Sequence, residues 1–153
     1  MNQPRIDITR HINSGMAKAL FALSAETSAK LEPKLFELVK IRASQINGCA
    51  YCLDMHTKDA RAAGETEQRI YALSAWRETP FFTDRERAAL EWTEAVTNIS
   101  QTHVPDEAYA RLASQFNEDE IVALTFGVVV INSWNRLAVS FRAPVGNYKP
   151  KAA

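Results

Sequence analysis

The chain has 153 residues, a length that fits one domain and suffices to bury a hydrophobic core without disulfide staples. Its 18 basic and 18 acidic residues balance, so no positive field attracts a phosphate backbone, and we do not expect nucleic acid as a partner. The first ten residues are polar and unlike a signal peptide, and the longest apolar stretch, 126–131, is too short to cross a bilayer. We therefore expect a soluble, cytoplasmic protein without a membrane partner.

The first half of the chain is typical of four helices separated by proline, glycine and capping residues. The first, about 14–29, places three apolar side chains on one stripe: Met16, Leu20 and Leu23. The second covers 33–46, begins with a proline whose missing N–H costs nothing there, and ends at Asn47-Gly48. The third covers 49–64, and the fourth is a short helix capped at residue 66 and closed by the proline at 80.

Two capping boxes open helices in the second half of the chain. The pair Thr83 and Glu86 predicts a helix to about residue 99, with an apolar stripe at every third or fourth position: Ala89, Trp92, Val96 and Ile99. A further helix is expected over 105–116. The pair Asn117 and Glu120 then predicts a long last helix that ends near residue 141.

Residues 127–131, Gly-Val-Val-Val-Ile, favour a strand by local propensity. They lie inside a capped, helix-period pattern with no second strand to pair with, and an isolated strand leaves its backbone groups unsatisfied. We therefore expect a helix, which is apolar nearly all round and must be covered on several sides, in part by other subunits. The sequence predicts an all-α, oligomeric protein with a single domain, 1–153, of about six to seven helices.

The two cysteines of the chain, Cys49 and Cys52, are three residues apart. A small secreted domain held by disulfides carries more cysteines at wider spacing, so this pair indicates redox chemistry or metal binding. In a helix that starts at Cys49, the two thiols and His56 lie at i, i+3 and i+7 on one face. The Cα atoms of the two cysteines are then about 5–6 Å apart, within the range that a disulfide tolerates. The spacing predicts a dithiol that cycles with its disulfide.

Helix position also predicts how these thiols are activated. A free thiol has a pKa of about 8.5; the unpaired N–H groups and the helix dipole favour the anion at Cys49 and, to a lesser degree, at Cys52. His56, one turn beyond Cys52, can accept its proton. Glu37 precedes Cys49 by twelve residues, about 18 Å along a straight helix. Only a reversal of the chain at Asn47-Gly48 brings Glu37 to the histidine or the thiols as a proton relay.

Glu37 followed by Cys49, Cys52 and His56 at this spacing resembles the core signature of alkylhydroperoxidase D, in the wider carboxymuconolactone decarboxylase-like superfamily. The resemblance continues less specifically to the Trp-Asn-Arg of 134–136 and covers most of the chain. A lone Cys-x-x-Cys is a weak signal, whereas the four-residue pattern is specific.

The resemblance implies a peroxidase that reduces organic or hydrogen peroxides. One thiolate attacks the peroxide to give a sulfenic acid, the other closes a disulfide, and a dithiol reductant such as a dihydrolipoyl protein restores the pair. It makes Cys52 the peroxidatic and Cys49 the resolving cysteine, whereas the helix-end argument alone favours Cys49 as the thiol of lower pKa. His56 and Glu37 form the proton relay. The resemblance implies a trimer or hexamer, and we expect no cofactor.

The chain departs from the family pattern at Tyr51. The family often has a histidine just before the second cysteine, where this chain has a tyrosine, whose side chain titrates near 10. The four core residues for thiol redox chemistry remain, and the proton relay of the peroxidase is shorter by one member.

The cysteine pair is also compatible with different chemistry. A zinc site is one alternative, with four ligands: Cys49, Cys52, His56 and Glu37. Such a site lacks the second pair of cysteines or histidines that zinc sites usually have. Two buried cysteines can equally be inert packing residues. At the level of the whole protein, a decarboxylase or lactone-processing enzyme and a non-enzymatic, redox-sensing oligomer both stay open.

The remaining distinctive side chains are expected to be structural. The tryptophans sit at core-like helical spacing: Trp76, Trp92 and Trp134. Asn135 and Arg136 are expected to tie helices or subunits together, and His11 and His103 to lie on the surface.

Overall fold

The computed structural model describes residues 3–150; residues 1–2 and 151–153, the ends of the predicted domain, lie outside that part. Across 3–150 the chain forms eight α-helices, two 3-10 helices and no strand. The α-helices are α1 (Gly15–Lys30), α2 (Pro33–Ile46), α3 (Ala50–Ala62), α4 (Glu67–Ala72), α5 (Asp84–Thr97), α6 (Ile99–Thr102), α7 (Asp106–Ala113) and α8 (Glu118–Phe141). The 3-10 helices are η1 (Ile8–His11) and η2 (Leu73–Glu78). The all-α prediction is confirmed, with eight helices in place of six to seven.

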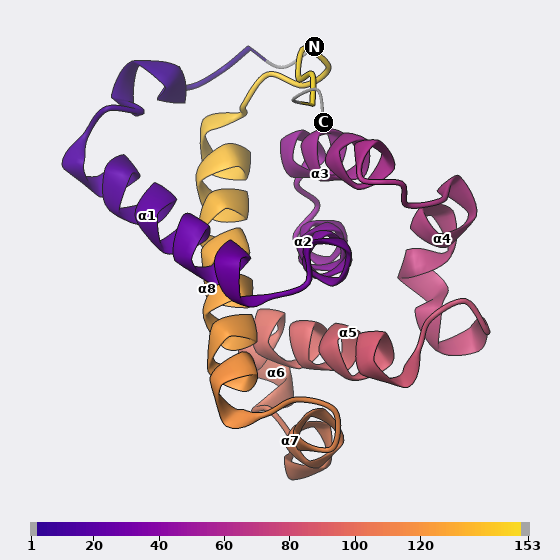
Figure 1. The fold of residues 1–153 in the computed structure, drawn as a ribbon. Coiled ribbons are helices and arrows are strands. Elements are labelled where there is room, and N and C mark those ends of the chain that lie inside the picture. Colours follow the sequence, from indigo (N-terminus) through magenta and orange to yellow (C-terminus); the bar gives the residue numbers. More distant parts are fainter. Residues whose placement is uncertain (1–2, 151–153) are drawn as a thin grey trace.

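Helix α2 lies at the centre of the fold, and α3, α5 and α8 pack around it (Figure 1). Helix α1 packs against α8, and α7 packs against α5. Because α2 is contacted from several directions, half of its residues are buried: Leu35, Phe36, Leu38, Val39, Ile41, Ala43 and Ser44. A polar side chain on this helix is therefore held among fixed neighbours, which is the setting of Glu37.

The capping residues identified in the sequence mark the observed helix starts. Thr83 and Glu86 form a reciprocal capping box at α5, and Asn117 and Glu120 form another at α8. Pro33 is the first residue of α2. Each box satisfies backbone N–H groups that have no partner inside the helix, which fixes where the helix begins.

Two predicted segments are interrupted. The helix expected from residue 66 to the proline at 80 becomes α4 and then η2, with a non-helical residue at Ala75. The helix expected to reach residue 99 stops at Thr97, because Asn98 leaves helical geometry and its side-chain amide donates to the Glu94 carbonyl at 3.2 Å. Ile99 therefore begins α6 and is 56% exposed, so the predicted apolar stripe of α5 ends at Val96.

The predicted stripe on α1 is wrong at Met16, which is 84% exposed, while its remaining two members are half-buried. The contact with α8 instead involves Phe21, whose ring lies 4.8 Å from that of Trp134, and Ser24, whose hydroxyl accepts from the Trp134 indole at 3.1 Å. The contact with Trp134 of α8 thus lies in the second and third turns of α1.

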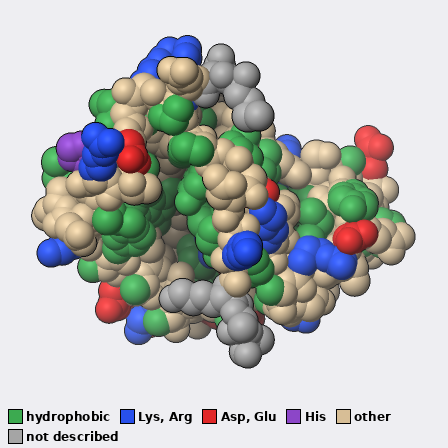
Figure 2. Space-filling view, turned by 90° about the horizontal axis from the view of Figure 1, so that it is seen from above, with side chains coloured by type: hydrophobic (Ala, Val, Ile, Leu, Met, Phe, Trp, Pro, Cys, Tyr) green, Lys and Arg blue, Asp and Glu red, His purple; other side chains and the backbone are tan. Residues whose placement is uncertain are grey.

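Residues 127–131 are helical, as expected, inside α8. By length and composition alone α8 would suffice to cross a membrane, but in this fold it packs against α1, α2, α3 and α5 as a core helix. One face of it is open: Val122, Phe126 and Val129 are each about half exposed. Figure 2 shows hydrophobic side chains gathered around a hollow on the face seen from above. Coverage of the open face of α8 by further subunits stays a prediction.

Gly127 lies where α8 packs against Phe36 of α2 and provides a test of the packing. A Cβ added at Gly127 would lie 2.5 and 2.9 Å from two ring atoms of Phe36, a buried side chain that is only 4% exposed. We expect Gly127→Ala to lower the free energy of unfolding by about 1–3 kcal/mol, the usual cost of overpacking a core. Urea denaturation measures this change.

Gly15→Ala is the matched control, because a Cβ at that helix start meets nothing within 4 Å. It is expected to leave the unfolding midpoint unchanged or slightly raised. Equal midpoints for Gly127→Ala and the wild type would contradict the tight α2–α8 contact.

Candidate functional site

The reversal between α2 and α3 takes place at Asn47-Gly48. Gly48 has φ +64°, a left-handed conformation that glycine adopts without the strain of a Cβ. The N–H of Asn47 closes the end of α2 by donating to the Ala43 carbonyl at 3.0 Å, and the N–H of Cys49 donates to the Ser44 carbonyl at 3.0 Å. The chain thus turns back at once, and α3 packs along α2 as expected.

A buried amide cluster ties this turn to α8. The Asn47 side chain donates to the Asn132 and Asn135 side-chain oxygens at 3.0 and 2.9 Å. Asn135, 1% exposed, in turn donates to the Ser44 hydroxyl at 3.0 Å. The prediction that Asn135 ties helices together is confirmed, whereas sequence reasoning missed Asn132. These hydrogen bonds fix the position of the turn that directly precedes Cys49.

Cys49 and Cys52 form a disulfide at the start of α3, with Cα atoms 5.4 Å apart, inside the distance expected from their spacing. Cys49 is the N-cap of α3, and its sulfur accepts the N–H of Cys52 at 3.3 Å. This contact agrees with the helix-end argument, since a backbone donor points at the first sulfur. Both cysteines are only 1% exposed, so the disulfide is enclosed by protein.

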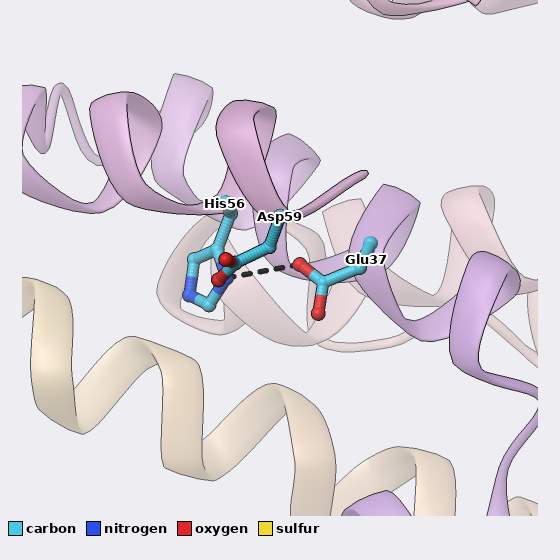
Figure 3. Close-up of side chains that lie close together, drawn as sticks. All are labelled: Glu37, His56 and Asp59. Carbon is cyan, nitrogen blue, oxygen red and sulfur yellow. Dashed lines mark hydrogen bonds and ion pairs between the residues drawn. The ribbon is translucent and has the colours of Figure 1, made fainter. Parts of the chain in front are cut away.

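His56 and Glu37 are brought together by the fold (Figure 3). The Nδ1 atom of His56 lies 3.0 Å from Glu37 Oε2, and Glu37 Oε1 forms an ion pair with Lys40 one turn along α2. Because a carboxylate only accepts, the histidine Nδ1–H is the donor. A neutral His56 then carries its basic lone pair on Nε2, the nitrogen available for a proton from a thiol.

Two opposing effects set the pKa of Glu37. Burial by itself raises the pKa, because it disfavours the charged carboxylate. The hydrogen bond from His56 and the positive charge of Lys40 outweigh burial and hold the pKa below its ordinary value of 4.5. Glu37 is therefore ionised at neutral pH and acts as an acceptor that orients the imidazole.

Asp59 is a member of the group that sequence reasoning missed. It follows His56 by three residues on α3, and ligand-type atoms of Glu37, His56 and Asp59 lie within 4.8 Å of one another. The Tyr148 hydroxyl, from the segment after α8, donates to Asp59 Oδ1 at 2.7 Å. The helical i+3 spacing from His56 was the available signal. This cluster differs from the zinc site that the sequence allowed, because its ligand-type atoms exclude the cysteines, which are bonded to each other.

The remaining side chains singled out in the sequence lie outside this group or at its edge. Trp76 and Trp92 are buried, as expected of packing residues, whereas His11 and His103 are exposed. Tyr51, between the cysteines, is half-buried. Cys52 is therefore preceded by a phenol side chain, where the family often has the imidazole of a histidine.

The lowered pKa of Glu37 predicts how stability depends on pH. At neutral pH the ionised carboxylate stabilises the fold, and this contribution is lost as pH falls below about 4.5 and through the lower folded-state pKa. We expect Glu37→Gln to be less stable than the wild type at pH 7, with the difference shrinking toward pH 3.5. Urea denaturation across this range measures it.

Glu26→Gln, on an exposed part of α1, is the control and is expected to run parallel to the wild type. A Glu37→Gln variant whose stability deficit stayed constant from pH 7 to 3.5 would refute the electrostatic role of the carboxylate.

With this geometry in place, the relatives of the chain are informative. Residues 13–95 match the model of the carboxymuconolactone decarboxylase family. The uncharacterised protein YdfG of Bacillus subtilis (strain 168) is 53% identical over 104 residues, which cover 68% of this chain and 71% of that protein.

Solved structures extend the likeness to most of the chain. A protein of unknown function from Agrobacterium tumefaciens, described as a putative antioxidant defence protein AhpD, is 44% identical with a TM-score of 0.89; the match covers 94% of this chain and all of that one. A peroxidase-related protein with an AhpD core from Ralstonia eutropha JMP134 shares the fold at 18% identity, with a TM-score of 0.79 over 94% of this chain and 77% of its own. The chain therefore belongs to the carboxymuconolactone decarboxylase family, as an AhpD-like protein of that superfamily.

Proposed function

We propose that this protein is a thiol-dependent peroxidase in which Cys52 and Cys49 are oxidised by an organic or hydrogen peroxide, with His56 and Glu37 as the proton relay. The observation that carries the proposal is the hydrogen bond from His56 Nδ1 to Glu37 Oε2. His56 is on α3, the helix that begins at the cysteine pair. It prepares the imidazole as a base one turn from Cys52.

The proposed reaction balances without a cofactor. Cys52 gives its proton to His56, and the thiolate attacks one peroxide oxygen. The O–O bond breaks, and the departing oxygen takes the proton from the His56 imidazolium, so that it leaves as an alcohol, or as water when the substrate is hydrogen peroxide. The sulfenic acid on Cys52 is then attacked by the Cys49 sulfur, which closes the disulfide and releases water. The two thiols lose two electrons, and the peroxide gains them. A dithiol reductant, such as a dihydrolipoyl protein, returns two electrons and two protons.

We assign the peroxidatic role to Cys52 and the resolving role to Cys49 on the family resemblance and on the position of His56. Cys52 lies one helical turn before His56 and can lose its proton to the imidazole. The Cys49 sulfur faces the N–H of Cys52, which favours its thiolate as the resolving nucleophile or as the group that leaves during reduction. Because both sulfurs are enclosed, a protein reductant reaches them only after side chains around the disulfide move.

A decarboxylase or lactone-processing activity is the second candidate, since the family takes its name from such an enzyme. This chemistry has no evident use for a cysteine pair that forms a disulfide. Turnover of a carboxymuconolactone that survives thiol alkylation would favour it over the peroxidase.

The proposal includes a cytoplasmic location and self-association as a trimer or hexamer. A reducing compartment keeps a close cysteine pair available for cycling. The half-exposed Val122, Phe126 and Val129 on α8 supply an apolar surface for a second subunit. Sedimentation of oxidised and reduced protein measures the assembly; a change of assembly with redox state, without peroxide turnover, would favour a redox-sensing oligomer.

Thiol titration with tert-butyl hydroperoxide tests the chemistry. We expect reduced wild-type protein to show two thiols before peroxide, none after one equivalent, and two again after dihydrolipoamide. Cys52→Ser should lose turnover, because no thiolate beside His56 remains. Cys49→Ser should instead stop at a sulfenic acid on Cys52, which dimedone traps and mass spectrometry detects.

Full peroxide reduction by both single cysteine variants would rule out the dithiol mechanism. A sulfenic acid trapped on Cys49 in Cys52→Ser, with rapid peroxide consumption, would reverse the order of the two cysteines.

A further inference from the structure

We propose that Asp59 is a positioning residue of the proton relay, and that Tyr148 holds its carboxylate in place beside His56 and Glu37. This inference rests on the proposed peroxidase function. Ligand-type atoms of Glu37, His56 and Asp59 lie within 4.8 Å of one another, so two carboxylates lie close to one imidazole (Figure 3).

Tyr148 serves as a hydrogen-bond donor in this group. Its hydroxyl donates to Asp59 Oδ1 at 2.7 Å. Burial, followed by the hydrogen bond and charge of Asp59 and by the charge of Glu37, raises the pKa of Tyr148 to about 12. The phenol therefore stays protonated at physiological pH. It fixes the Asp59 carboxylate and does not itself relay protons.

The segment that carries Tyr148 is fastened to α3 at two further points. Lys58 donates to the Tyr148 carbonyl at 3.1 Å, and the N–H of Gly146 donates to Asp54 Oδ2 at 3.3 Å. Lys58 and Asp54 are themselves an ion pair at 2.8 Å. Gly146 has φ +103°, which favours glycine and lets the chain turn onto the helix. Contacts with Asp54, Lys58 and Asp59 of α3 thus hold this segment so that the Tyr148 hydroxyl meets the Asp59 carboxylate.

The charges around His56 give Asp59 its role. From α2, Glu37 is already offset by Lys40; from α3, Asp54 is offset by Lys58. Among residues 3–150 no lysine or arginine pairs with Asp59; its donor is the neutral Tyr148, with Tyr51 close by. The group of Lys40, Glu37, His56 and Asp59 is therefore an anion with neutral imidazole and becomes neutral when His56 accepts the thiol proton. Asp59 supplies the counter-charge to the imidazolium.

The test compares reduced wild-type protein with Asp59→Asn and Tyr148→Phe from pH 5 to 9. One arm follows single-turnover oxidation by tert-butyl hydroperoxide, and the other follows alkylation by iodoacetamide, which reports the thiolate without peroxide. We expect Asp59→Asn to slow both reactions about tenfold at pH 7 and to move the half-maximal rate up by about one pH unit. Tyr148→Phe removes one neutral hydrogen bond and should act in the same direction, roughly threefold. Tyr109→Phe, an exposed tyrosine on α7, should match the wild type.

A purely structural role for Asp59 would lower stability without moving the pH profile, so unchanged profiles in both variants would overturn the inference. If Asp59→Asn does not fold, the pH profile of Tyr148→Phe alone tests the inference. A wild type inert to peroxide would overturn the peroxidase function, while the alkylation profiles still decide on Asp59.

Discussion

The hydrogen bond between His56 and Glu37 joins two helices that would carry these residues far apart if the chain ran straight. It requires the reversal at Asn47-Gly48, and that reversal is held by side-chain amides that reach α8. The central position of α2 keeps Glu37 fixed and partly buried, so its charge acts through a medium less polar than water. The packed core and the chemistry of the cysteine pair thus depend on one turn.

The enclosed disulfide corresponds to the oxidised state of the cysteine pair. Cys49 caps α3 and contributes to the start of the helix even when bonded to its partner, so oxidation does not cost the helix its cap. The nearby charges are arranged so that the imidazole has a carboxylate on each helix, Glu37 from α2 and Asp59 from α3. In the proposed relay, such an arrangement lets a proton arrive at His56 with little rearrangement of the surrounding protein.

What the sequence predicts well here is local. The i, i+3 and i+7 positions of Cys49, Cys52 and His56 follow from helix periodicity, and the capping boxes mark the starts of α5 and α8. What it missed depends on distant contacts: Tyr148 meets Asp59 from 89 residues away, and Asn132 meets the turn from 85. The exposed Met16 has the same origin, since periodicity gives the face of a helix and not the length over which a neighbour covers it.

The coupling between Glu37 and His56 is measured most directly by a double-mutant cycle on the rate at which tert-butyl hydroperoxide oxidises the reduced dithiol. The variants are Glu37→Gln, His56→Asn and the pair together, each with its folding checked by circular dichroism. If the two side chains act as one relay, the double variant is slowed by nearly the same factor as His56→Asn alone. Independent slowing factors that multiply in the double variant would contradict a shared relay.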